Sequence, residues 1–313
     1  MLAEIVRRLL ATIPVMGVVA IAVFALLHVT PGDPAVIIAG DYATSDDIAR
    51  IRAKLGLDLP FTTQVAIWVG RIVRGDLGTS IFSGMPVSRL IGQRAEATIS
   101  LTLLAMIISV GLGVPIGVLA AWKKGSWIDR LVMVFAVSGF SMPVFWLGFV
   151  LVYIFAISFH WLPVQGFQPI ERGLTAFLRH LILPALTLSV VYMALIARMT
   201  RASMLGVLDE DYIRTAFAKG LAPWRVLVRH ALKNASLPVV TIIGIGFALL
   251  IGGAVVTESV FALPGLGRLT VDAIVRRDYP VIQGVILVVS GVYVLINLVV
   301  DILYVVLDPR ITY

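Results

Sequence analysis

The chain has 313 residues, of which 59% are hydrophobic and only 14% charged, and its mean hydropathy is +1.00. A soluble domain carries roughly 25% charged residues, so this composition excludes a soluble globular fold. The sequence contains no cysteine, which excludes disulfides, thiolate metal sites and cysteine nucleophiles. The net charge is +7. Because the basic residues lie largely between apolar runs, they indicate membrane lipid, and not nucleic acid, as the partner.

Six apolar runs have about the length, close to 20 residues, that a helix needs to cross a bilayer. They are Leu9–Val29, Ile99–Trp122, Leu131–Phe159, Leu181–Ala197, Ala235–Thr257 and Tyr279–Val300. The sequence therefore predicts an all-α membrane protein of about six transmembrane helices. The first run is longer than the core of a cleavable signal, so residues 1–29 are interpreted as an uncleaved anchor. The third run is long enough to tilt, or to end in an interfacial turn near Trp161 and Pro163.

The short loops predict the orientation of the chain, because Lys and Arg accumulate on the cytoplasmic side. With the N-terminus in the cytoplasm, most Lys and Arg of the short loops fall inside, and fewer fall outside. Both termini are therefore predicted to be cytoplasmic. Residues 30–95 are too long for this rule and form the first outer loop.

The first outer loop is predicted to be structured. Ser45 is interpreted as the cap of a helix over Asp46–Leu55, which has aspartates in its first turn and Gly56 after its end. Phe61–Arg74 has a broad apolar face, which predicts a second helix on the membrane surface. The predicted organisation is an anchor at 1–29, a periplasmic loop at 30–95 and a five-helix core at 96–313.

The segment 201–236 has the pattern of a helix–glycine–helix unit. A short helix is predicted over Asp209–Lys219, Gly220 ends it in a left-handed conformation, and Pro223 suits the first turn of the next helix. An apolar face is predicted on that second helix, formed by Trp224, Leu227, Val228, Ala231 and Leu232. The pattern leaves two interpretations open: an amphipathic hairpin on lipid headgroups, and a rigid docking element for a protein partner.

Polar side chains inside predicted spans are candidates for a translocation path, because they are costly in a membrane and often functional. The candidates are Ser109, Ser138, Ser141, Glu258, Asn297 and Asp301. A structural role is the alternative for each. Serines commonly bond the backbone of their own helix, and Glu258 could pair with Arg268.

Catalytic chemistry has little support in the sequence. The four histidines are scattered over different segments. The paired carboxylates stand at helix starts, where their negative charge interacts favourably with the positive end of the helix dipole. The chain has no Gly-x-x-x-x-Gly-Lys-Ser/Thr loop to hold a nucleotide phosphate. We therefore expect no enzyme activity, no metal and no cofactor in this chain itself.

Residues 211–224 and 229–238 resemble the cytoplasmic loop of ABC-importer permeases of the dipeptide, oligopeptide and nickel branch. The general loop reads Glu-Ala-Ala, three residues, then Gly; those places hold Arg214, Thr215, Ala216 and Gly220, so the glutamate is absent. Residues 94–98 also depart from the Arg-Leu-Pro-like start of the second span. Further similar motifs, in family order, are residues 31–34, 55–60, 75–80, 258–267, 278–284 and 307–310.

The resemblance implies a type I importer permease in the bacterial inner membrane that works by alternating access. The implied partners are a second homologous permease, two ATPase subunits that bind ATP and Mg, and a periplasmic or lipid-anchored substrate-binding protein. The residues implied in ATPase coupling are Asp211, Thr215, Ala216, Gly220, Leu221, Pro223 and Trp224. Of the polar side chains in the predicted spans, Ser138, Ser141, Glu258 and Asn297 are predicted to line the translocation path.

The expected substrates are dipeptides and oligopeptides. Nickel and glutathione remain alternatives within the same family. A self-sufficient secondary transporter and a membrane-embedded enzyme are the competing classes, but the first is typically built with more spans and inverted repeats. Glycines in the second and fifth spans allow close helix packing, either within the chain or between two permeases. They are Gly111, Gly113, Gly117, Gly244, Gly246, Gly252 and Gly253.

Overall fold

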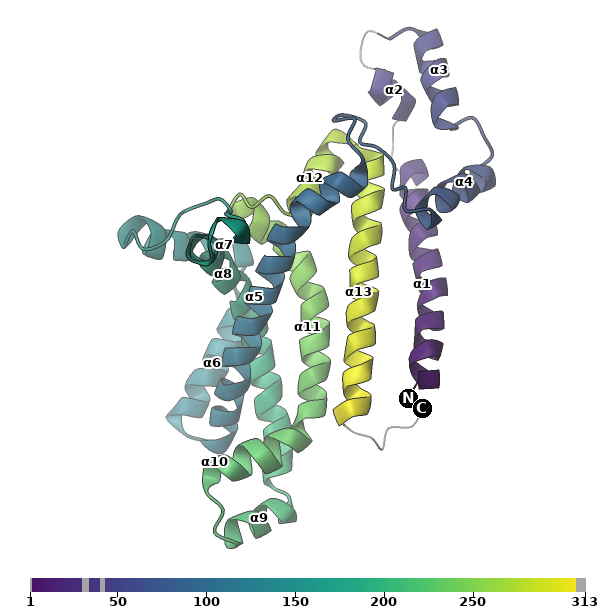
Figure 1. The fold of residues 1–313 in the computed structure, drawn as a ribbon. Coiled ribbons are helices and arrows are strands. Elements are labelled where there is room, and N and C mark those ends of the chain that lie inside the picture. The colour runs from purple at the N-terminus through teal and green to yellow at the C-terminus, as the bar shows by residue number, and fades with distance from the viewer. Residues whose placement is uncertain (1, 30–33, 40–42, 308–313) are drawn as a thin grey trace. The chain divides into compact units, whose positions relative to one another are not determined.

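The structure is a computed structural model that describes residues 2–29, 34–39 and 43–307 (Figure 1). It divides into two units, one made of residues 1–95 and 268–295 and the other of residues 96–267 and 296–313. Residues 31–33 of the predicted loop motif and 308–310 of the terminal motif lie outside the described residues. Each unit is considered by itself.

The first unit holds the outer loop helices and parts of three longer helices. Its elements are α1 (Leu2–Val29), α2 (Pro34–Ala39), α3 (Ser45–Leu55), α4 (Phe61–Val73), the start of α5 (Val87–Trp122), and most of α12 (Leu266–Arg276) and α13 (Tyr279–Leu307). Helix α4 begins at Phe61 as predicted and ends one residue before the predicted Arg74. It packs on α1, where the Phe24 ring lies 5.6 Å from that of Phe61 and 5.3 Å from that of Trp68.

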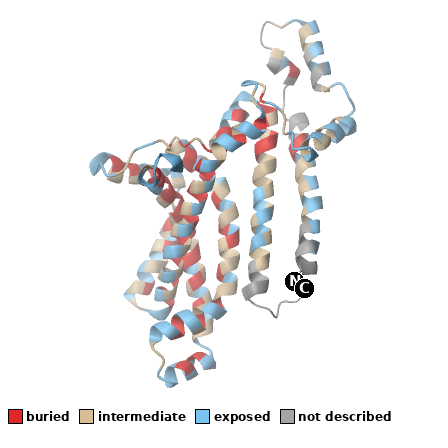
Figure 2. Cartoon of the chain, in the orientation of Figure 1, coloured by how far each residue is buried: buried red, intermediate tan, exposed pale blue. Residues whose placement is uncertain are grey.

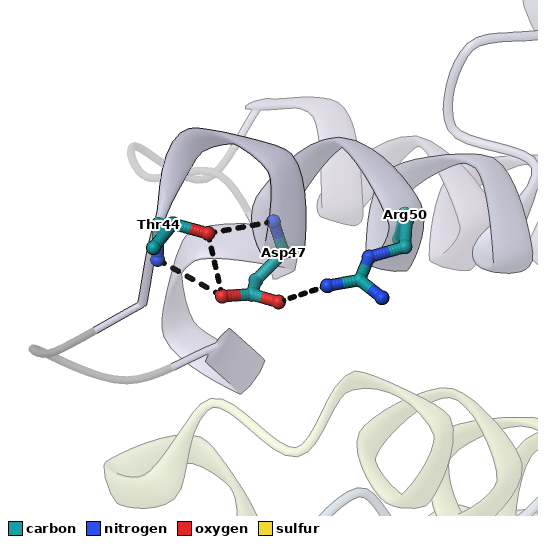
Figure 3. A network of polar contacts seen from close by, with 3 residues as sticks. All are labelled: Thr44, Asp47 and Arg50. Carbon is teal, nitrogen blue, oxygen red and sulfur yellow. Dashed lines mark hydrogen bonds and ion pairs between the residues drawn. The ribbon is translucent and has the colours of Figure 1, made fainter.

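The helix α3 begins one residue earlier than predicted, and its cap is Thr44 and not Ser45 (Figure 3). The Thr44 hydroxyl accepts the Asp47 N–H at 3.3 Å, and the Thr44 N–H donates to Asp47 Oδ2 at 3.1 Å. This reciprocal pair is a capping box, which satisfies two helix-end donors at once. Gly56 ends the helix with φ +68°, as the sequence predicts.

A short polar junction closes the first unit after α4. The buried carboxylate of Asp278 accepts the Ser80 hydroxyl at 2.5 Å and the Ile81 N–H at 3.2 Å. These bonds join the loop before α5 to the residue before α13. Two of the motifs singled out in the sequence, at 75–80 and 278–284, therefore meet in space.

The second unit holds the rest of α5 and the helices that follow it in the chain. They are α6 (Trp127–Ser141), α7 (Val144–Leu151), η1 (Val152–Ser158), η2 (Ile170–Arg172), α8 (Leu174–Leu208), α9 (Asp211–Ala218), α10 (Pro223–Arg225), η3 (Val226–Leu232) and α11 (Lys233–Val260). Helix α8 is central: its buried residues Leu181 and Leu188 share one apolar core with Leu101 of α5 and Leu250 of α11.

Burial on α5 alternates with the helical period (Figure 2). Leu101 and Ala105 are buried in the core, whereas Ile99, Leu103 and Ile107 are exposed. An apolar stripe that faces outward at spacing i, i+4 and i+8 is what a lipid-facing helix surface needs. The exposed apolar surface therefore fits a membrane environment.

Four helices are long and apolar enough to cross a membrane, and a bent pair provides a fifth if it counts as one span. Helix α1 contains a shorter apolar stretch, Leu10–Ala25. The predicted span over Leu131–Phe159 is not one straight helix: α6 and the helix from Val144 to Ser158 are separate and bent by 108°. The reason is Pro143, which lacks an N–H and disfavours helical geometry in the residue before it, Met142.

Candidate functional site

The site begins at the turn between α9 and α10, where Gly220 has φ +77°. The Gly220 N–H donates to the Phe217 carbonyl at 2.9 Å, and the Leu221 N–H donates to the Ala216 carbonyl at 3.4 Å. This pair of bonds is a Schellman motif, in which the residue after the helix must be left-handed. Glycine adopts that conformation without the penalty that other residues meet. The predicted helix–glycine–helix turn is confirmed.

The second helix of the segment is continuous from Pro223 through η3 into α11. Its η3 section is a π-helix, whose wider turn shifts the direction of the side chains. In this part of the helix Val226, Leu227 and Ala231 are buried, whereas Trp224 and Val228 are exposed. Three members of the predicted apolar face, Leu227, Ala231 and the half-buried Leu232, pack inside the chain, and the other two, Trp224 and Val228, are exposed.

The buried side of this segment packs into one apolar cluster with the ends of two long helices. Its members are Ala121 of α5, Met204 of α8, Ile213 and Ala216 of α9, Val226, Leu227 and Ala231 of η3, and Ala235 of α11. We call this set the coupling cluster. A second link is polar: the Asn234 amide donates to the Tyr212 hydroxyl at 2.6 Å and joins α11 to α9. The segment is thus fixed to the spans.

The other side of the segment exposes large apolar side chains. Tyr212 and Phe217 of α9, Trp224 of α10 and Val228 of η3 are all exposed, Trp224 at 63%. We call these four residues the exposed apolar set. The guanidinium of Arg225 lies 5.4 Å from the centre of the Trp224 ring. Exposed aromatic groups of this kind, rimmed by charge, mark protein interaction sites.

The seven predicted coupling residues all lie on or beside this turn, with different exposure. Ala216 is buried in the coupling cluster, and Leu221 packs against it. Asp211 starts α9, and its backbone carbonyl accepts the Thr215 hydroxyl at 2.9 Å. Asp211, Thr215, Gly220, Pro223 and Trp224 are exposed.

An ion pair near the coupling cluster was not identified from the sequence. Arg201 of α8 donates to both carboxylate oxygens of Asp129 on α6, at 2.5 and 2.8 Å. The Asp129 carboxylate also accepts the Gly125 N–H at 2.9 Å, and the Asp129 N–H donates at 3.4 Å to the hydroxyl of Ser126, which caps the start of α6. Ser126 three residues before an aspartate was a helix-start signal. The partner on α8 could not be inferred, because it is 72 residues away.

The predicted path residues lie on three elements. Ser138 and Ser141 are on α6, Glu258 is in the last turn of α11, and Asn297 is an exposed residue of α13. The Ser141 hydroxyl donates to the Val137 carbonyl at 2.9 Å, a bond within its own helix. Glu258 is fully buried and accepts the Thr98 hydroxyl.

Most of the glycines predicted at helix contacts pack inside the chain. A methyl group at Gly117 would lie 2.5 Å from the Ala197 carbonyl, and one at Gly244 would lie 2.5 Å from Val300. Gly113, Gly246 and Gly253 also face neighbouring helices, whereas Gly111 and Gly252 face open space. Packing within one subunit is therefore the role of five of the seven.

Within the part of the chain that the structure describes, no group of three or more His, Asp and Glu side chains could hold a metal ion. What the site presents is a set of exposed apolar groups on a segment that is packed against the ends of α5 and α8.

Long apolar helices that surround α8, and a helix–glycine–helix segment packed against the ends of α5 and α8, define a multi-pass helical membrane protein. The chain belongs to the family of binding-protein-dependent transport system inner membrane components: that family's model matches residues 113–313, and its N-terminal counterpart matches residues 1–102. It is a multi-pass inner-membrane permease subunit of a peptide-type ABC importer.

Curated relatives match over nearly the whole chain. A probable peptide ABC transporter permease protein of Sinorhizobium fredii is 55% identical over 99% of both chains. The dipeptide transport system permease protein DppB of Alkalihalophilus pseudofirmus and the glutathione transport system permease protein GsiC of Salmonella typhimurium are each 45% identical over 100% of both chains. The relatives thus share one family, and their names give different substrates.

A solved structure has a similar fold. The methionine ABC transporter MetNI in an inward-facing conformation contains a chain that matches with a TM-score of 0.58, at 20% identity, over 71% of this chain and 97% of that chain. The likeness places the fold among type I importer permeases, as the sequence predicts.

Proposed function

We propose that this chain forms half of the translocation path of an ATP-driven importer of dipeptides and oligopeptides. The peptide and dipeptide names of relatives with 45–55% identity over the full chain support this substrate class. Glutathione, named for another relative, is itself a small peptide and is the first alternative. Nickel is the second, and it rests only on the family resemblance.

The segment 201–236 is proposed to couple this chain to ATPase subunits. The observation that carries the proposal is the exposed apolar set, held on a segment whose opposite side is buried in the coupling cluster. Exposed Trp224 and Phe217 are suited to fill a pocket of a partner, and the rigid packing behind them would pass the partner's movement to α5 and α8. ATP and Mg would bind to the ATPases.

The proposed assembly contains a second homologous permease, two ATPase subunits and a substrate-binding protein outside. Both termini and the segment 201–236 are assigned to the cytoplasm, in agreement with the distribution of Lys and Arg. Six spans remain the proposal: five are given by the four long helices and the bent pair, and α1 supplies the sixth. Ser138, Ser141 and Asn297 are proposed to line the path, because they are polar groups at membrane depth.

The experiment is reconstitution of the chain with its cognate permease, ATPases and binding protein in proteoliposomes. We expect uptake of a labelled dipeptide that requires ATP, with glutathione and Ni²⁺ as poorer competitors. Trp224→Ala should lower ATPase co-purification at least about tenfold, since a buried aromatic anchor contributes about 2 kcal/mol or more. Trp127→Ala, at a helix start remote in sequence and also exposed, is the matched control.

Two results would contradict this proposal in different ways. Uptake by the chain alone, driven by an ion gradient, would make it a secondary transporter. Full ATPase co-purification by the Trp224 and Phe217 double alanine variant would remove the docking role of the segment, while leaving the family assignment intact.

A further inference from the structure

A buried carboxylate lies at the end of α11 that is remote from the coupling cluster. Glu258 is 0% exposed, and its Oε1 accepts the hydroxyl of the buried Thr98 of α5 at 2.5 Å. A carboxylate in such a place is costly unless hydrogen bonds compensate. A buried carboxylate at this position therefore needs a functional or structural explanation.

The Thr98 hydroxyl joins three segments. It donates to Glu258 and accepts the N–H of Leu266, the first residue of α12, at 2.8 Å. The Leu263 N–H in turn donates to the backbone carbonyl of Glu258 at 2.9 Å. Helix α5 at Thr98, the end of α11 and the turn after α11 therefore converge on two side chains. We call this arrangement the Thr98–Glu258 junction.

Two glycines allow the turn after α11 to lie in close contact with the Glu258 carboxylate. A methyl group on Gly265 would lie 2.1 Å from Cδ and Oε1 of Glu258. One on Gly267 would lie 2.6 Å from Cα of Val255 and 2.9 Å from Oε2 of Glu258. Such close contact leaves the carboxylate no space for another rotamer. A substrate has no access to it either, which argues against a direct role of Glu258 in the path.

Both helices that meet at the junction also reach the coupling cluster. On α5, Thr98 is 23 residues (121 − 98) before Ala121, about 35 Å along a helix. On α11, Glu258 is 23 residues (258 − 235) after Ala235, about the same distance. The two helices are thus joined at both ends, by apolar packing at one and by hydrogen bonds at the other.

We propose that Thr98 and Glu258 are positioning residues that staple α5 to α11, so that both helices move as one body when the coupling segment moves. Apolar surfaces can slide past each other, whereas a buried hydrogen bond fixes the register of its two partners. The junction would thereby carry movement to the side of the membrane opposite the ATPases. This inference rests on the proposed function.

The test is the number of dipeptides taken up per ATP hydrolysed by the reconstituted importer. Thr98→Val keeps the shape of the side chain but removes the hydroxyl, and Thr98→Ser keeps the hydroxyl. We expect the valine variant to retain ATP hydrolysis and to lose at least about fivefold in the ratio, the lower range of coupling effects. The serine variant should keep the wild-type ratio. A merely structural residue would lower both activities together with the amount of inserted protein.

A second pair of substitutions tests whether the junction stays closed, and the chain has no native cysteine to interfere. The 2.8 Å contact between Leu266 N and Thr98 Oγ1 keeps the two Cα atoms within about 6.8 Å, the range of a disulfide. In the Thr98→Cys, Leu266→Cys double variant, reduction of the disulfide should uncouple transport from ATP hydrolysis. Oxidation, with the disulfide verified by mass spectrometry, should restore the coupling.

Three results overturn the staple. The first is a wild-type ratio of uptake to ATP hydrolysis in Thr98→Val. The second is a joint loss of uptake, ATP hydrolysis and inserted protein in that variant. The third is a block of transport when the double variant is oxidised, which would mean that the junction must open. A wild-type complex without ATP-driven uptake would instead refute the proposed function, so the two failures are distinguishable.

Discussion

Helices α3 and α9 end in the same backbone turn, but different forces hold them. After α3, the Gly56 N–H donates to Ala53 and the Leu57 N–H donates to Arg52, the same pair of bonds that Gly220 and Leu221 make after α9. At the other end, α3 has a capping box, whereas α9 has no side-chain cap bond at Glu210. In its place, α9 has Ile213 and Ala216 buried in the coupling cluster.

The difference shows how the source of a helix's stability decides what the helix can transmit. The stability that a helix gains from its own caps is local and does not depend on the elements that it packs on. A helix held by tertiary packing moves together with the elements that it packs on. For this reason α9, and not α3, is suited to connect a partner to α5 and α8.

The largest expected effect is at Ile213. Ile213→Ala should destabilise the protein by about 2–5 kcal/mol, because it opens a cavity in the coupling cluster. Ile48→Ala is the matched change in α3, where the side chain is half-buried, and we expect a loss of about 1 kcal/mol. Thermal unfolding of the purified protein, with hydrogen exchange of residues 211–218, measures both. Equal losses at the two positions would remove the distinction between the two helices.

The second effect concerns the shared turn. Valine at Gly220 or Gly56 should cost about 1–2 kcal/mol, because both positions have left-handed φ. Only Gly220→Val should also lower the coupling of ATP hydrolysis to uptake, with the protein still inserted in the membrane. Asparagine tolerates this conformation, so Gly220→Asn should retain coupling. Unchanged transport by Gly220→Val would contradict the docking role.

Local signals in the sequence were sufficient for much of both regions. Gly56, Gly220 and Pro223 stand where helices end and begin, because their backbone preferences act within a few residues. What failed depended on tertiary context. The π-helical section at η3 is an irregularity that a regular period cannot reveal.

Long-range partners were also beyond the sequence. Glu258 was a candidate for the translocation path because it is a carboxylate in an apolar run. Its partner Thr98 is 160 residues away, and nothing in the spacing indicates that the two meet. The same holds for Asp129 and Arg201. Membrane helices gain specificity from such polar contacts, which single-sequence periodicity does not encode.

The smallest effect is a local one at the cap of α3. Hydrogen bonds from the Thr44 side chain and then the Thr44 backbone hold the pKa of Asp47 below its ordinary value of 3.8, with Arg50 adding to them. Because the folded-state pKa is lowered, the cap's contribution is complete above pH 3.8 and is lost as the pH falls through the lower folded value. Helix α3 should therefore fray only in acid.

Titration of the full-length protein tests this, with aspartate carboxyl carbons labelled for NMR and Asp47→Asn used to identify the signal. Thr44→Ala should raise the pKa of Asp47 toward 3.8, because it removes the hydrogen bond that lowers this pKa most, whereas Ser45→Ala should leave the pKa unchanged. The reverse result would restore Ser45 as the cap. A shift of the Asp47 pKa in both variants would mean that the whole first turn, and not one capping side chain, stabilises the start of α3. The contrast between a helix stabilised by its cap and α9, which is stabilised by packing, would then no longer hold for α3.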